Sequence, residues 1–492
     1  MTLTPPEDPG VPASLPPITG VIGGVRGTAA THATVLALAA SYDRAGDRMR
    51  GWAAHAGRLA ADPGLLATAP LSPLTFTAAE AAVLEAATGV HGVLLSSIAY
   101  EADAVAVRAA VRAFDECDQL VADTMHALDY DVGRCVGTTV ATVAPALLAT
   151  AAVALPLLVE VGPHLPAPAR RRLAADLGLA SDAAQEAVDR RPALLQHVVD
   201  GSGGLLDGLL SGATGPAGVT TYHPTVARAA GDLALLYAPE GSPRVVRRPD
   251  LAVPLAHTTP RCVADLMRHL DQTNALSTPD RPDDQGTLEI QTLRAADGTV
   301  RRVVYLPGTD DLATLPWSHD ADVRDLPTDL RLIAGRPTTY AAGIEHAMLG
   351  AGIRPGEPVL LVGHSQGGME AAALVASGSP FHVAAVVTAG SPIAQVHGYP
   401  PGTQVLSLEN RGDVVPLLDG ADNPDSVRHV TVQFDDHETS IAADHAIAHY
   451  VRGAESVDVS LDPSVRAQVE SLHRQGFLSG RVTDSRVFQV TR

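Results

Sequence analysis

Residues 359–368 read Val-Leu-Leu-Val-Gly-His-Ser-Gln-Gly-Gly, and this stretch decides the fold class of the chain. An apolar run of strand length enters Gly363-His364-Ser365-Gln366-Gly367 and is followed by a helix-like segment, residues 369–377. A Gly-x-Ser-x-Gly pattern between a strand and a helix is typical of a sharp turn that lifts a serine hydroxyl clear of a sheet. The glycines let the two backbones pass closely. The alternative is a glycine-rich turn with an inert serine, because a chain with 44 glycines can contain the bare pattern by accident.

Strand and helix patterns alternate on both sides of this turn, from about residue 251 to residue 457. The strands are expected at residues 286–293, 299–306, 359–362, 383–388, 404–408 and 429–434. The first two are joined through Ala295-Ala296-Asp297-Gly298, a good hairpin turn. Continuous apolar runs in the central strands fit parallel strands that are buried on both faces. The pattern therefore predicts an α/β doubly wound, mostly parallel sheet.

A serine hydroxyl is a weak nucleophile at neutral pH, so it needs a base within hydrogen-bond reach and a third group that orients the base. Asp413 is the expected acid, because it follows the second strand beyond the serine turn, at the sheet edge that faces the serine. Asp419, Asp422 and Asp425 lie nearby in a longer segment. The alternative for Asp413 is an aspartate that only caps the turn at Gly412.

Three histidines follow the last expected strand and compete as the base: His437, His445 and His449. We prefer His445, because it stands where a loop meets the start of a probable helix and can point back over the sheet edge. His445 and His449 are also four residues apart, as two metal ligands on one helix face would be. The zinc-protease pattern needs a glutamate directly after the first histidine, where this chain has Ala446. We therefore expect no catalytic metal.

An acyl-transfer site also needs two backbone N–H groups that stabilise the developing oxyanion. Gln366, directly after the serine, is expected to supply one, and Thr309, in the loop after an earlier strand, the other. The alternative is an ordinary strand-ending turn at Gly308. His364 and Trp317 are expected to line the substrate pocket, Trp317 from the loop 311–330.

Together these motifs resemble the α/β-hydrolase superfamily, and the lipase/esterase branch in style. The resemblance is carried by the serine turn, by Gly390-Ser391-Pro392, by the acid loop 410–416 and by the segment 445–450. It covers roughly residues 299–451, less than half of the chain. It implies a serine, acid and histidine that act as a triad, with no cofactor. The sequence departs from lipases with a lid domain, because no large insertion separates residue 383 from Asp413.

Composition limits the function classes. A chain of 492 residues is too long for one core, so two or more domains are expected. The formal net charge of −20 argues against nucleic acid, or an anionic membrane surface, as the main partner. Three cysteines provide neither a disulfide framework nor a zinc spacing.

Four regions are expected along the chain. Residues 1–30 are a proline-rich, disordered lead-in without the features of a Sec signal peptide, and residues 31–250 form an all-α helical domain. Residues 251–460 form the α/β-hydrolase catalytic domain, and residues 461–492 a helix and a short strand.

Two segments of the helical domain leave alternatives open. The uncharged stretch 135–159 is long enough to cross a bilayer, but prolines at 145 and 156 would kink or end a helix. It is either a buried hairpin or core helix, or a membrane-inserting element. The glycine-rich segment 201–218 is either a flexible connection or a set of small residues packed between helices.

The helical region is weakly similar to the WXG and LXG hairpins that precede effector domains in type VII secretion. Gly51-Trp52 near a helix end carries the similarity, which implies a secretion partner chain and export by a non-Sec route. The sequence departs from the pattern at Ala54, where a glycine is expected. The sequence also lacks the Tyr-x-x-x-Asp/Glu export signal at its tyrosines 42, 100 and 130, because none of them is followed four residues later by an acidic residue.

Three functional hypotheses follow. The leading one is a serine hydrolase that cleaves an acyl ester or lipid substrate through an acyl-enzyme intermediate, with no cofactor and no nucleic acid. The second is a secreted or membrane-active effector, whose helical half binds a partner chain or contacts a membrane through residues 135–159. The third is an inactive scaffold with the hydrolase fold. Whether the chain is cytoplasmic, exported or membrane-associated stays open at this point.

Overall fold

The computed structural model describes residues 15–143, 192–214, 222–277, 284–295, 298–312, 314, 316, 321–436 and 441–492. The chain divides into two compact units. Thr28–Thr124 form one, which we call the helical unit, and Met1–Gly27 with Met125–Arg492 form the other, which we call the sheet unit.

The described residues of the sheet unit contain a nine-stranded mixed sheet in the order β1-β8-β7-β6-β5-β4-β3-β9-β2. Its strands are β1 (Ile18–Gly23), β2 (Arg244–Arg247), β3 (Thr287–Arg294), β4 (Val300–Leu306), β5 (Pro358–His364), β6 (His382–Ala389), β7 (Gln404–Asn410), β8 (His429–Phe434) and β9 (Arg481–Thr491). The strands from β4 to β8 pair in parallel, and the outer pairs are antiparallel. The parallel core agrees with the continuous apolar runs of the central strands, which are buried on both faces.

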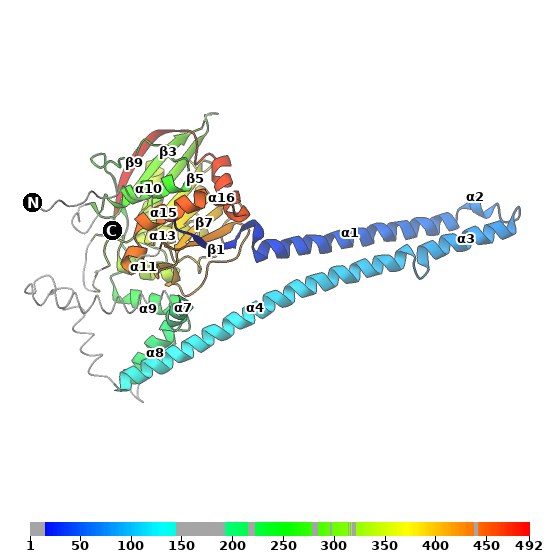
Figure 1. Ribbon diagram of the computed structural model, residues 1–492, viewed down its shortest axis with the longest axis horizontal. Coiled ribbons are helices and arrows are strands. Elements are labelled where there is room, and N and C mark those ends of the chain that lie inside the picture. The colour runs from blue at the N-terminus through cyan, green and yellow to red at the C-terminus, as the bar shows by residue number, and fades with distance from the viewer. Residues whose placement is uncertain are drawn as a thin grey trace, which may run out of the picture. The chain divides into compact units, whose positions relative to one another are not determined.

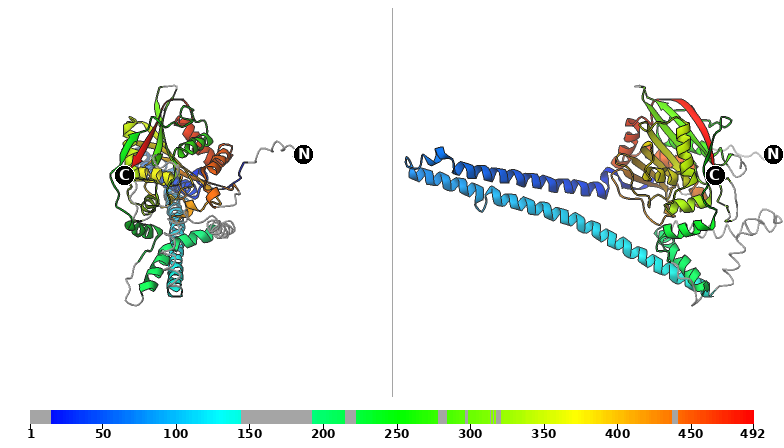
Figure 2. Two further views of the ribbon diagram at one scale, coloured as in Figure 1. Left: turned by 90° about the vertical axis from the view of Figure 1, so that its left-hand side faces the viewer. Right: turned by 180° about the vertical axis from the view of Figure 1, so that it is seen from behind.

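Helices cover both faces of this sheet (Figure 1, and from behind in Figure 2). Besides the last part of α4 (Val93–Val143), the described residues of the sheet unit contain the helices α7 (Pro192–Asp200), α8 (Ser202–Thr214), α9 (Val226–Leu233), α10 (Val263–Asn274), α11 (Leu326–Ile333), α12 (Thr339–Gly350), α13 (Gln366–Ala376), α14 (Ile441–Asp444), α15 (Ile447–Asp458) and α16 (Pro463–Arg474). One hydrophobic core joins the sheet to α10, α15 and α16. A second core joins the opposite face to α12 and α13. The expected α/β class is thus confirmed.

Three outer strands of the sheet differ from the predicted regions. Residues 18–23 were expected in a disordered lead-in, but they form β1, which pairs with β8 while Ile18 and Val21 pack against the core. β2 belongs to the sheet and not to the helical region. β9 is longer than the predicted short strand and lies between β3 and β2. In each case a long-range strand partner, which local sequence does not reveal, satisfies the backbone hydrogen bonds.

The helical unit is an antiparallel helical hairpin. It contains α1 (Thr28–Ala60), α2 (Pro63–Leu66), α3 (Pro73–Thr88) and the first part of α4 (Val93–Val143). α1 packs against α3, and the beginning of α4 lies beside α1 in Figure 1 and in the right-hand view of Figure 2. Cross-helix ion pairs join Arg50 to Glu101 and Arg108 to Asp43. The buried seam consists mostly of small residues: Ala39, Gly46, Ala87, Ser97, Ala104 and Val111.

In the sheet unit, the last part of α4 packs on α8 through glycines. A Cβ on Gly133 would lie 2.0 Å from the carbonyl oxygen of Gly201, and one on Gly204 would lie 2.0 Å from that of Tyr130. The glycines at 201, 204 and 208 therefore let α4 and α8 pack closely, which corresponds to the second alternative for this segment. Residues 215–218 lie outside the described part.

Of the uncharged segment 135–159, the structure describes only residues 135–143, which are the end of α4. The rest of the segment lies outside the described residues. Within the described part, the helical stretch Pro73–Thr139 is long and apolar enough to cross a membrane by length and composition, a test that long helices of soluble proteins also pass.

Candidate active site

Ser365 lies at the turn between β5 and α13 with φ 52° and ψ −122°. Among the described residues other than glycine, it has the only positive φ. The close approach of strand and helix enforces this turn, because a Cβ on Gly367 would lie 2.0 Å from the carbonyl oxygen of Leu306, and one on Gly363 would lie 2.4 Å from the Gly367 backbone. The sharp turn expected from the Gly-x-Ser-x-Gly pattern is therefore present in the structure.

Asp413 and His445, which are distant in sequence, meet at the carboxyl edge of the parallel strands. The Nδ1 atom of His445 lies 2.7 Å from Oδ2 of Asp413. The Asp413 side chain is fully buried and also accepts hydrogen bonds from the Tyr450 hydroxyl at 2.6 Å and from the Val415 N–H at 2.9 Å. These contacts hold the carboxylate in one orientation toward the imidazole.

Two residues that the sequence analysis missed position this pair. The Asn410 amide donates to the carbonyl oxygen and to the carboxylate of Asp444, the residue before His445. Tyr450, on α15, bonds Asp413 directly. A polar residue at the end of a buried strand is a weak signal that could have pointed to Asn410, whereas no local pattern marks Tyr450.

His364 also contacts His445. Its ring centroid lies 4.6 Å from that of His445, and its Nε2–H donates to the carbonyl oxygen of His445 at 2.9 Å. Burial lowers the pKa of His364 to about 3, so the ring is neutral at physiological pH. His364 lines the cavity above the serine. Trp317, the other predicted pocket residue, lies outside the described residues.

Ser365 and His445 line the same cavity. Within the part of the chain that the structure describes, no hydrogen bond joins the Ser365 hydroxyl to the His445 ring. Such bonds are often long in ligand-free sites and tighten when a substrate is bound.

The competing histidines do not share this arrangement. His449 binds Asp436, with 2.5 Å between Nδ1 and Oδ2, and Arg452 binds the same carboxylate at 2.8 Å. His437 lies outside the described residues. His445 and His449 thus bind different carboxylates, and no group of three or more potential metal ligands occurs within the part of the chain that the structure describes.

The predicted oxyanion residues, Gln366 and Thr309, are linked by a third side chain. Asp329, on α11, accepts hydrogen bonds from Nε2 of Gln366 at 2.8 Å and from Oγ1 of Thr309 at 3.0 Å. Gln366 is the first residue of α13, so its backbone N–H has no acceptor inside the helix. A Cβ on Gly308 would lie 3.0 Å from the Cβ of Ser365, so the Thr309 loop passes next to the serine.

Asp329 was not foreseen from the sequence. Burial raises its pKa to about 7, with the hydrogen bonds from Thr309 and Gln366 acting in the opposite direction. Its carboxyl group joins the two loops that would supply the oxyanion donors, which makes it a candidate positioning residue.

The cavity above Ser365 has a volume of about 610 Å³. Its walls come from α7, α8, α9, α11 and the loops around the serine. The lining residues are Val198, Val199, Ser202, Leu205, Leu206, Val226, Ala229, Ala230, Leu233, Asn274, Gly308, Thr309, Leu312, Leu326, Asp329, Leu330, Ile333, His364, Ser365, Met369, Pro392, Val415, Leu418 and His445. The polar residues of the candidate triad and oxyanion loops occur in an otherwise largely apolar lining.

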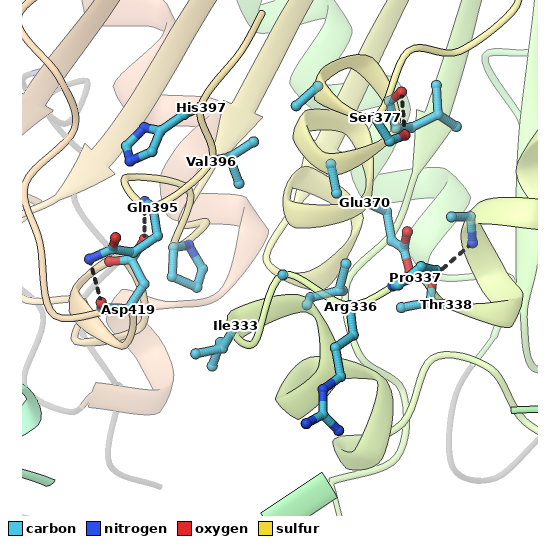
Figure 3. Close-up of a pocket in the computed structure, with 17 residues that line it drawn as sticks. Ile333, Arg336, Pro337, Thr338, Glu370, Ser377, Gln395, Val396, His397 and Asp419 are labelled. Carbon is cyan, nitrogen blue, oxygen red and sulfur yellow. Dashed lines mark hydrogen bonds between the residues drawn. The ribbon is translucent and has the colours of Figure 1, made fainter. Parts of the chain in front are cut away.

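A second cavity of about 330 Å³ adjoins it between α11, α12 and α13 (Figure 3). The two cavities share the wall residues Ile333 and Pro392. Glu370 lines the second cavity, and its carboxyl group accepts a hydrogen bond from the Thr338 hydroxyl at 2.6 Å. Burial raises the pKa of Glu370 to about 8.

No model of a known protein family matches this chain, and comparisons with curated proteins and with solved structures also give no match. The chemistry of the site is therefore inferred from its own residues and their geometry.

Proposed function

We propose that the chain is a serine hydrolase with the α/β-hydrolase fold, a doubly wound sheet, and that it cleaves carboxylic esters. One observation carries the proposal: the buried Asp413 carboxylate is bonded to His445, which lines the same cavity as a serine on a strained strand-to-helix turn. This is the arrangement that activates a serine for acyl transfer.

In the proposed reaction, Ser365 Oγ attacks the ester carbonyl carbon while Nε2 of His445 takes the hydroxyl proton. The tetrahedral oxyanion is stabilised by the backbone N–H groups of Gln366 and Thr309. Collapse of the tetrahedral intermediate expels the alcohol, which takes the proton from His445. Water then attacks the acyl-enzyme while His445 takes its proton. The bond between the acyl carbon and Ser365 Oγ breaks, His445 returns the proton to Oγ, and the carboxylic acid leaves.

Labelling with a fluorophosphonate probe and turnover of short p-nitrophenyl esters test the proposal. We expect Ser365 to be labelled, and Ser365→Ala to lose labelling and to lose turnover by several orders of magnitude while it stays folded. Labelling that persists in Ser365→Ala would contradict the assignment. A folded protein with neither labelling nor turnover would indicate an inactive scaffold.

A second function is proposed for the helical stretch Pro73–Thr139. Its length and apolar composition are sufficient for membrane contact, and large apolar side chains such as Phe114 and Leu120 are exposed on it. Flotation of the full chain with zwitterionic and with anionic vesicles tests membrane binding. Failure to float with either lipid would remove this function.

A further inference from the structure

The cavity above Ser365 has two chemically different parts. The catalytic residues and the Thr309 loop contribute polar atoms. The remaining walls, from α7, α8, α9 and α11, are almost entirely aliphatic, with leucines at 205, 206, 326 and 330. A site of several hundred cubic ångströms with apolar walls and a few convergent polar groups is typical of one that binds a mostly apolar ligand.

No lysine or arginine occurs among the described lining residues. The carboxyl group of Asp329 is held by Thr309 and Gln366. The cavity therefore offers no cation to a phosphate or carboxylate group, and a charged ligand buried there would lack a partner. A hydrocarbon chain has no such requirement.

The position of His445 indicates which half of an ester would occupy the apolar walls. The side chain of His445 is 24% exposed, whereas that of Asp413 is fully buried, so the base lies on the solvent side of the pair. The leaving alcohol takes its proton from this histidine and must depart. The acyl group stays attached to the serine through the second half of the reaction, so an enclosing apolar wall suits the acyl group.

The helices that form this wall are held by a polar network. The buried carboxylate of Asp207, on α8, accepts hydrogen bonds from the Tyr130 hydroxyl at 2.8 Å and from the His223 N–H at 2.6 Å. The His223 ring lies between Asp207 and Asp232, so it connects α8 to α9. The wall therefore has a defined position over the serine.

We propose that this cavity binds a linear acyl chain of medium to long length, and that Ala229 and Ala230 of α9 set its width. This inference rests on the proposed function. Both alanines are 5% exposed and line the cavity, so a larger side chain at either position would occupy space that the acyl chain needs.

A series of p-nitrophenyl esters from acetyl to hexadecanoyl tests the proposal on the full chain. Each buried methylene stabilises the bound state by about 0.8 kcal/mol, so kcat/KM should rise about fourfold for each added carbon until the cavity is filled. A parallel series of alkyl acetates varies the alcohol instead and should show little dependence on length. A steep dependence in the alcohol series only would overturn the acyl assignment.

Substitutions on α9 then locate the chain. Ala230→Leu should lower the ratio of kcat/KM for decanoyl to acetyl ester at least tenfold and should move the optimum to a shorter chain. Ala227→Leu is the matched control, since Ala227 lies on the same helix but does not line the cavity. It should leave the ratio unchanged. Equal profiles for both variants and the wild type would overturn the role of α9.

The outcomes separate this inference from the proposed function. Failure of every ester and of fluorophosphonate labelling would reject the hydrolase itself. Labelling of Ser365 and turnover of acetyl ester, together with a flat acyl-length profile, would reject only the acyl-chain site. If Ala230→Leu does not fold by circular dichroism, Ala229→Val provides a smaller change at the neighbouring wall position.

Discussion

At the scale of single residues, the site depends on a strained serine. The φ of 52° at Ser365 is a conformation that residues with a Cβ rarely adopt, and such strain costs about 1–3 kcal/mol. Gly363 and Gly367 make this turn possible, because a Cβ on Gly363 would clash with the start of α13 and one on Gly367 would clash with the carbonyl oxygen of Leu306, at the end of β4. The hydroxyl is thereby presented at the start of a helix, at some cost in stability.

This strain leads to a stability prediction. The free energy of unfolding of Ser365→Gly should be about 1 kcal/mol higher than that of Ser365→Ala, because glycine adopts the turn without strain. This relief of strain should outweigh the greater conformational entropy of glycine in the unfolded chain. Both variants lack the proposed nucleophile, so catalysis does not affect the comparison. Chemical denaturation followed by circular dichroism measures the difference. An Ala variant as stable as the Gly variant would show that the turn is not strained.

A second residue-scale prediction concerns Asp329, which binds both Gln366 and Thr309. Asp329→Ala should lower kcat on short esters by about 10- to 100-fold and leave KM within about twofold, because misplaced oxyanion donors weaken transition-state binding. Asp329→Asn keeps an acceptor oxygen and should lose less. Steady-state kinetics measures kcat and KM separately. The exposed Asp422→Ala is the control, and a change confined to KM would contradict a positioning role.

At the scale of elements, the hairpin of the helical unit depends on small residues at its seam. Ala104 and Ala39 are completely buried, and a Cβ on Gly46 would lie 3.2 Å from the carbonyl oxygen of Ser97. Two long helices can approach closely through such residues, which leaves many larger apolar side chains exposed, among them Trp52 and Phe114.

Enlarging a seam residue should therefore weaken the hairpin. Ala104→Leu is expected to destabilise it by about 1–3 kcal/mol, because the added side chain cannot be accommodated between α1 and α4. Hydrogen exchange of the full chain should show faster exchange of the α1 amides in this variant. Ala102→Leu, at an exposed position of the same helix, should exchange like the wild type. Similar protection in both variants would argue against the tight seam.

At the scale of the whole molecule, buried carboxyl groups make stability depend on pH. Burial raises the pKa of Glu370 to about 8, and the pKa values of Asp329 and Glu409 to about 7. Each group keeps its proton in the folded state at a pH where the unfolded chain has lost it. Their stabilising contribution is therefore present below about pH 4 and is lost as pH rises through 7 to 8.

The thermal midpoint of the sheet unit should accordingly fall as the pH rises from about 5 to about 8. Glu370→Gln cannot ionise, so it should be more stable than the wild type at pH 8 and differ little at pH 5 (Figure 3). Scanning calorimetry across this range measures the effect. The exposed Glu470→Gln should follow the wild-type curve. A Glu370→Gln variant with the same pH slope as the wild type would contradict the raised pKa.

Much of the sheet unit could be predicted locally. The six expected strands correspond to β3 through β8. The central parallel strands β5 and β6 are continuous apolar runs, and β3 and β4 are joined by a recognisable hairpin turn. β1, β2 and β9 were missed or misassigned because their stability comes from partners far away in the chain. The candidate acid and base could be placed at strand ends, but Tyr450 and Asp329 could not, since their roles depend on which helix packs over which loop.

By itself, the sequence determined the α/β class, the serine turn and the order of serine, acid and histidine, because these depend on neighbouring residues and on strand periodicity. The tertiary structure alone decided that His445 and not His449 meets Asp413, that Asp329 joins Gln366 to Thr309, and that α8 and α9 contribute an apolar wall to the cavity above the serine. Those contacts join segments tens to hundreds of residues apart. Their geometry is set by packing between elements, which no local pattern encodes.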